Sequence, residues 1–80
     1  MKMTYEEKLI HYATAPRATA GKLTQFIDGN FVDYWAGRLR GVFVKIGDEF
    51  KFNNKQDAIN LAKRYRQDCI NEAKAKGLIN

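Results

Sequence analysis

Apolar residues recur at helical spacing near the start of the chain. Thr4 and Glu7 have the spacing of a capping box, in which each side chain accepts a hydrogen bond from the backbone amide of the other residue. Pro16 disfavours helical geometry at the residue before it. The pattern therefore predicts a helix from Tyr5 to Ala13. Its apolar stripe consists of Tyr5, Leu9 and Tyr12.

A second apolar stripe follows Pro16. Its members recur at spacings of three and four positions and would share one helical face: Ala20, Leu23, Phe26 and Ile27. Thr19 is a candidate N-cap for this segment. The sequence "DGN" at 28–30 is typical of a turn, because Gly29 is free to take a positive φ. These features predict a second, short helix that ends before the turn.

The segment "FVDYWAGRLRG", residues 31–41, fits two structures. As a helix it would carry three large apolar residues on one side: Phe31, Trp35 and Leu39. Asn30 could cap its start, and Gly41 suits the position just past its end. Gly37 would cost such a helix about 1 kcal/mol relative to alanine. We favour a helix over 31–40, and a strand at Phe31–Trp35 remains the alternative.

Apolar residues recur at every second position in the next segment, "VFVKIGDEFKF". Val42, Val44 and Ile46 would point to one side of a strand, with Phe43 and Lys45 on the other. Gly47 suits the first central position of a type II′ turn. The pattern predicts a two-stranded hairpin over residues 42–52, with Lys45 and Lys51 on the outward face.

A long helix closes the chain. Asn53 or Asn54 can cap its start, and Gly77 can end it. Its buried stripe would contain Ala58, Leu61, Ala62, Tyr65, Cys69 and Ala73.

The predicted order is α-α-α-β-β-α in a single domain, residues 1–80, that is mainly α with a β-hairpin. Three short helices followed by a hairpin resemble the winged helix-turn-helix, over residues 5–52, with the helix at 53–77 as an addition. The segment "VFVKIGDEFKFNNKQDAINLA" is also similar to the wing of small excisionase and MerR-type modules. The matching residues are Val44, Ile46, Gly47 and Phe52. If Phe31–Trp35 is instead a strand, the chain becomes a three-stranded sheet packed by the last helix, a layout that resembles some sheet-based DNA readers and double-stranded-RNA domains.

The net charge of the chain indicates a polyanionic partner. The chain carries a net charge of +5, and the excess of Lys and Arg is concentrated in residues 53–80. Such charge attracts phosphate, so a nucleic acid is a candidate partner.

The remaining composition narrows the class of protein. One cysteine and one histidine allow neither an intrachain disulfide nor a zinc site built from Cys and His, which indicates a reducing, cytoplasmic location. No apolar run approaches the length of a membrane span, and the first ten residues lack a signal-peptide core. There is no nucleophile–histidine arrangement, phosphate-binding glycine loop or carboxylate pair. We therefore expect no enzyme, no catalytic residue, no metal and no cofactor.

Two functions remain open. The first is a small basic DNA-binding protein, a transcriptional regulator or recombination accessory factor, that contacts double-stranded DNA through a recognition helix at 31–40 and the hairpin. Its candidate nucleic-acid-binding residues are Arg17, Lys22, Arg38, Arg40, Lys45 and Lys51. The alternative is a small protein-binding inhibitor or adaptor of the type encoded by phages and mobile elements. Its candidate contact residues are Tyr34, Trp35 and Phe43.

Under either function, we expect the same ten residues to be buried in the core: Leu9, Leu23, Phe26, Ile27, Trp35, Leu39, Val44, Phe50, Leu61 and Tyr65.

Overall fold

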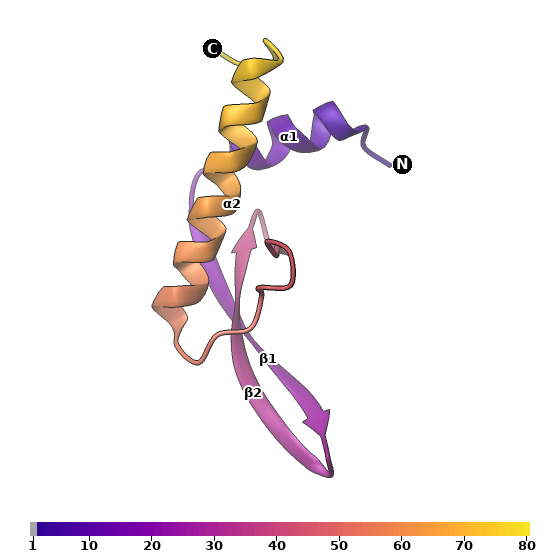
Figure 1. Ribbon diagram of the computed structural model, residues 1–80, viewed down its shortest axis with the longest axis vertical. Helices are drawn as coiled ribbons and strands as arrows, with labels where there is room; N and C mark the ends of the chain where they lie inside the picture. Colours follow the sequence, from indigo (N-terminus) through magenta and orange to yellow (C-terminus); the bar gives the residue numbers. More distant parts are fainter. Residues whose placement is uncertain (1) are drawn as a thin grey trace.

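The computed structural model describes residues 2–80 and shows two helices and one antiparallel sheet, with strand order β1-β2-β3 (Figure 1). The elements are α1 (Tyr5–Ala13), β1 (Ala18–Ile27), β2 (Asn30–Leu39), β3 (Val42–Phe43) and α2 (Lys55–Ala75). The fold is therefore α+β, and the predicted three-helix, winged-helix arrangement is wrong. The open alternative, a three-stranded sheet packed by the last helix, describes the architecture.

The first helix has the predicted bounds. The side chain of Thr4 accepts from the amide of Glu7 at 3.2 Å, and the Glu7 carboxylate accepts from the amide of Thr4 at 3.2 Å. Leu9 and Ala13 are buried against α2 and Tyr12 is half-buried, but Tyr5, the remaining residue of the predicted stripe, is 57% exposed, so the stripe is only partly correct.

A long hairpin, β1–β2, occupies the two segments that were predicted to be the second and third helices. The "DGN" turn is present, but it joins strands: Asp28 and Gly29 have φ values of 50° and 81°. Two consecutive residues with positive φ are what a type I′ hairpin turn requires, and its twist matches that of the strands. The helical spacing of the apolar residues in these segments was coincidental.

Close packing against α2 explains why residue 37 is glycine. A Cβ at Gly37 would lie 2.5 Å from the carbonyl oxygen of Ala58 and 3.0 Å from the Cβ of Ala62. Glycine within a strand commonly marks such an approach of another backbone. Gly37, Trp35 and Leu39 therefore lie on the sheet face that α2 covers, since alternate residues of a strand share a face.

The predicted hairpin over 42–52 is correct only at its turn. Ile46 and Glu49 exchange backbone hydrogen bonds of 3.1 and 2.9 Å around Gly47, whose φ is 59°. The flanking residues do not pair with each other. β3 follows a two-residue turn at Arg40-Gly41 and pairs with β2, and the chain later returns so that Phe52 exchanges hydrogen bonds of 2.8 and 2.9 Å with Trp35.

The last helix begins and ends as predicted. Asn54 is the N-cap, and Gly77, with φ of 72°, follows the C-terminal turn. Five of the six residues of the predicted stripe are buried and Tyr65 is half-buried. None of the helices within residues 2–80 is long and apolar enough to cross a bilayer.

Two connected clusters form the core. One lies between α2 and the sheet around Leu39 and Leu61, and the other lies between α1 and α2 around Leu9 and Cys69. Of the ten residues expected in the core, four are buried: Leu9, Leu39, Val44 and Leu61. Four more are half-buried: Leu23, Trp35, Phe50 and Tyr65.

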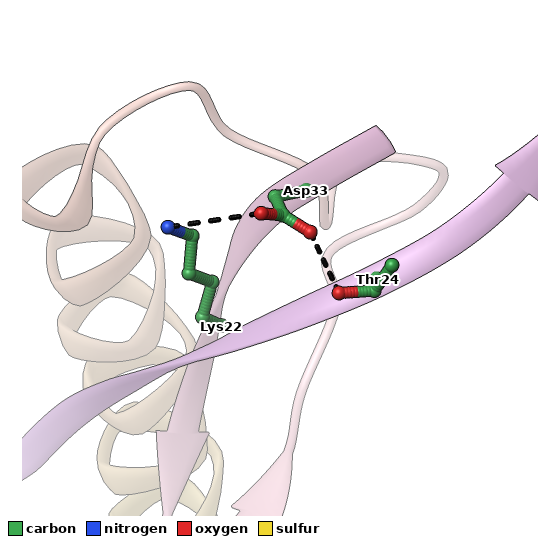
Figure 2. Close-up of polar contacts among 3 residues, drawn as sticks. All are labelled: Lys22, Thr24 and Asp33. Carbon is green, nitrogen blue, oxygen red and sulfur yellow. Dashed lines mark hydrogen bonds and ion pairs between the residues drawn. The ribbon is translucent and has the colours of Figure 1, made fainter. Parts of the chain in front are cut away.

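The other two, Phe26 and Ile27, are exposed, because the outer half of the hairpin extends past both helices (Figure 1). We call this projecting part, residues 24–33, the arm. Phe26 and Phe31 are 62% and 77% exposed, and their rings contact each other at a centroid distance of 5.1 Å. At the base of the arm, Asp33 of β2 contacts Lys22 and Thr24 of β1, with a 2.6 Å hydrogen bond from the Thr24 hydroxyl (Figure 2).

Candidate nucleic-acid interface

One face of the sheet, the covered face, packs on α2, and side chains from residues 43–50 lie over part of the other face, where Ala36 is 1% exposed. Residues directly opposite each other on antiparallel strands lie on the same face, so the Gly21–Ala36 and Leu23–Tyr34 pairs lie opposite the face that packs on α2. A Cβ at Gly21 would lie 3.0 Å from the Cδ of Arg38 and from the Cε1 of Phe43, which places those two side chains on the same side. We call this surface the open face.

Arg38 and Phe43 form a stacked pair on the open face. The guanidinium carbon of Arg38 lies 5.1 Å from the centroid of the Phe43 ring, and its Nη2 donates to the carbonyl of Gly41 at 3.1 Å. The two residues are also cross-strand partners in the β2–β3 register. Phe43 stays 42% exposed, so its ring is accessible to a ligand.

A second group of aromatic and cationic side chains lies beside it. The ring of Phe50 meets that of Tyr34 at a centroid distance of 6.2 Å, edge to face. The ammonium of Lys51 lies 5.2 Å from the Tyr34 ring and 5.3 Å from the Phe50 ring, and it donates to the side chain of Gln25 at 2.6 Å. The cation is thereby held over the sheet rather than extended into solvent.

A shallow apolar hollow of about 210 Å³ separates the two groups. Ala36 forms part of its floor, and Phe43 and Phe50 are among its walls. The lining residues are Leu23, Ala36, Phe43, Val44, Lys45 and Phe50. Lys45 is exposed and lines both this hollow and the groove between α1 and α2, so it lies at the edge of the open face.

Three of the six candidate nucleic-acid-binding residues therefore lie at the open face: Arg38, Lys45 and Lys51. Lys22 lies on the covered face, where its ammonium is 3.8 Å from the carboxylate of Asp33 and 5.8 Å from the Trp35 ring centroid. Arg17 is exposed in the connection between α1 and β1.

Arg40 is engaged with α1. It occupies the β2–β3 turn with φ of 51°, so it belongs to no recognition helix. Its Nε donates to the carbonyl of His11 at 2.8 Å, and its Nη2 donates to the carbonyl and hydroxyl of Thr14 at 3.1 and 3.2 Å. These carbonyls belong to the C-terminal end of α1, where a cation is favoured by the helix dipole.

The three residues considered for a protein partner do not form one surface. Tyr34 and Phe43 lie on the open face, whereas Trp35 is half-buried on the covered face between the ammonium groups of Lys22 and Lys55, each 5.8 Å from its ring centroid.

Phe50 also contributes to the open face, although its sequence position predicted a place in the core. It is half-buried, and its ring contacts Tyr34 and the ammonium of Lys51. The available signal was the alternation of Tyr34, Ala36 and Arg38, which places these residues on one face only if residues 31–39 form a strand.

A separate groove of about 260 Å³ lies between α1 and α2 and is lined partly by Leu9, Tyr12, Tyr65 and Cys69. Burial raises the pKa of the Cys69 thiol and of the Tyr65 phenol above their ordinary values. A thiol kept protonated is a poor nucleophile, which agrees with the expectation that Cys69 packs as a small apolar residue.

Comparisons with known proteins found no family model, no curated protein and no solved structure that matches this chain.

Proposed function

We propose that this chain is a small DNA-binding protein that contacts the duplex through the open face of its sheet. The observation that carries the proposal is the pairing of cations on that face with one exposed ring, Phe43, and two half-buried rings, Tyr34 and Phe50. Arg38 lies over Phe43, and Lys51 lies over Tyr34 and Phe50.

The chemistry of this surface suits DNA. Arg38, Lys45 and Lys51 supply positive charge for phosphates, and a guanidinium can also donate two hydrogen bonds to a guanine edge. The apolar hollow beside Ala36 can accept a thymine methyl group or another flat apolar edge. A β-ribbon or sheet is narrow enough to enter the major groove, so no recognition helix is needed. The cellular role would be that of a transcriptional regulator or recombination accessory factor.

Charge distribution supports the same surface. The closest ion-pair contacts made by Asp33 and Glu49 are with Lys22 and Arg64, respectively, so two carboxylates near the sheet are partly neutralised by cations that lie off the open face. Arg38 and Lys51 donate to uncharged oxygens, of Gly41 and Gln25, so their positive charges are not neutralised by these contacts and can attract phosphate.

The test is binding of a fluorescently labelled duplex of mixed sequence, followed by anisotropy across a salt titration. We compare the parent with the double variant Lys45→Ala/Lys51→Ala. The matched control is Lys63→Ala/Lys74→Ala, which removes the same charge from exposed positions on α2.

Each lost phosphate contact should lower the slope of log K against log salt by about one, so the open-face variant should lose a slope of about two and the α2 control almost none. An equal loss in both variants would mean that only the overall charge matters. If the protein prefers single-stranded DNA to the duplex, single-stranded DNA is its ligand and the duplex is not. If it binds neither in a salt-sensitive way, the proposal is refuted.

A further inference from the structure

We propose that the outer edge of β1 pairs with the same edge of a second copy of this chain, forming a two-fold symmetric dimer with one continuous six-stranded sheet.

The free edge follows from the hydrogen-bond pattern. The backbone groups of Trp35 and Gly37 bond to Phe52 and Val44, so they point away from β1. The alternate residues of β2 must then bond β1 through the residues opposite them, which are Thr19, Gly21 and Leu23. The intervening backbone groups of β1 face outward, at Ala18, Ala20, Lys22, Thr24 and Phe26.

The usual protections of an edge strand are missing from β1. Natural edges are blunted by outward lysines, prolines, bulges or short length. β1 has ten residues paired without interruption to β2, and it contains no proline. Its one charged residue, Lys22, is drawn across the covered face to Asp33 (Figure 2). An unpaired edge of this length is a template for another strand.

The size pattern along β1 identifies a second copy as the occupant. Its first four residues are small, and its larger apolar residues, Leu23, Phe26 and Ile27, lie in its second half. Antiparallel pairing of β1 with itself therefore sets the larger residues near its end beside the small residues at its start. A register centred on Leu23 places Phe26 opposite Ala20 of the second copy and Gln25 opposite Gly21. The register centred one residue earlier would set Lys22 opposite Lys22, which is unfavourable.

Charge favours the same register. It brings the turn at Asp28-Gly29 beside the start of the partner strand, where the exposed Arg17 precedes β1. Four hydrogen-bonded residue pairs, from Ala20 to Phe26, would add about eight backbone hydrogen bonds. The second copy would also cover part of the exposed Phe26 ring.

The assembly stops at two copies. Along the inner half of β2, the other side is occupied by β3, Val44 and Phe52, so β1 offers the longer unpaired edge within residues 2–80. A two-fold axis perpendicular to the sheet keeps both open faces on one side and both copies of α2 on the other. If the open face binds DNA as proposed above, the dimer contacts two symmetric half-sites.

Self-association is measured without DNA, so its outcome is independent of the proposed function. Sedimentation equilibrium should give twice the chain mass of 9.2 kDa at high concentration, dissociating on dilution. Thr24→Pro removes an outward amide at the centre of the edge and leaves the bonds to β2 in place. It should weaken dimerisation at least tenfold. The control Thr24→Ala loses the same hydroxyl contact to Asp33 but keeps the amide, and it should dimerise like the parent.

Cysteine cross-linking tests the register. Leu23 would face its symmetry mate as a non-hydrogen-bonded pair, with Cα atoms about 4.5 Å apart, within disulfide range. Leu23→Cys should give a covalent dimer on non-reducing gels that disappears with reductant. In Gln25→Cys the two thiols would lie on strands offset by about 13 Å and should not cross-link.

A parent that stays at 9.2 kDa up to millimolar concentration would overturn the proposal and assign the edge to another protein's strand or to none. Equal dimerisation of Thr24→Pro and Thr24→Ala, with far-UV circular dichroism confirming that both are folded, would show that association uses another surface. Association beyond two copies would refute the two-fold arrangement.

Discussion

Replacing Gly37 with alanine tests the packing of α2 on the sheet. The added Cβ would lie 2.5 Å from the carbonyl oxygen of Ala58, 3.0 Å from the Cβ of Ala62 and 3.2 Å from its amide nitrogen. The two nearest backbone atoms belong to a regular helix, so neither can rotate away as a side chain could. Relief requires α2 to move away from β2 by several tenths of an ångström, which disturbs the packing around Leu39 and Leu61.

The magnitude follows from two opposing effects. Forcing an extra methyl group into a packed core costs about 1–3 kcal/mol. Alanine recovers about 0.5–1 kcal/mol, because glycine loses more conformational freedom on folding. Because the added Cβ would lie 2.5 Å from a backbone oxygen, the steric cost should fall in the upper part of its range, and the net loss of unfolding free energy should be about 1–2 kcal/mol. For a domain of this size, that loss corresponds to a melting temperature lower by roughly 5–15 °C.

Thermal and urea unfolding followed by far-UV circular dichroism give the measurement. The control is Gly21→Ala, whose added Cβ would meet only side-chain atoms, of Arg38 and Phe43, at 3.0 Å and beyond. Those side chains are on the open face and can shift, so Gly21→Ala should cost less than Gly37→Ala. The sign of the effect is decisive. In a helix over 31–40, Gly37→Ala would stabilise the protein by about 1 kcal/mol. A variant as stable as the parent would refute the close approach of α2.

The two helices could be predicted from the sequence because their signals are local. The capping box at Thr4, the cap at Asn54 and the glycine at position 77 mark ends that the neighbouring residues alone determine. One side of α2 is buried along the whole helix, so apolar residues recur in its sequence with the helical period of 3.6 residues.

The β1–β2 hairpin could not be predicted in the same way because its two halves have different surroundings. In the inner half, Trp35 and Leu39 are covered by α2 on one face while Ala36 is buried on the other face as well. In the arm, large apolar residues are exposed on both faces, as Phe26 and Ile27 show. In neither half do apolar and polar residues alternate, as they do in a strand with one buried and one solvent-exposed face. The sequence therefore lacks the two-residue period by which such a strand is recognised.

The candidate site was predicted in composition but not in arrangement. Arg38, Lys45 and Lys51 were identified as cations that could meet phosphate, and they do adjoin one face of the sheet. The assignment of Arg40 depended on a helix that does not form, and the turn at residues 40–41 instead directs its side chain to α1. The grouping of cations with aromatic rings depends on the β2–β3 register and on the return of the chain at Phe52, which are contacts between distant residues.

Two further predictions concern α1 and its contact with α2. Burial raises the pKa of Cys69, so the unfolded chain releases this proton at lower pH than the folded chain; stability should therefore fall as the pH rises from the ordinary thiol pKa toward the folded value. Urea midpoints measured across this pH range should fall less in Cys69→Ala, and equal slopes would contradict the burial. Arg40→Ala removes three hydrogen bonds to the C-terminal end of α1, from Nε to His11 and from Nη2 to Thr14. Because these bonds involve a charged donor in an exposed setting, we expect a loss of about 1–2 kcal/mol in urea unfolding. Arg40→Lys should recover little of it, since one ammonium cannot reproduce the spaced donors of the guanidinium. If Arg40 acts only in this way, DNA affinity per folded molecule stays at the parent value; a loss of affinity with unchanged stability would instead make Arg40 a DNA contact.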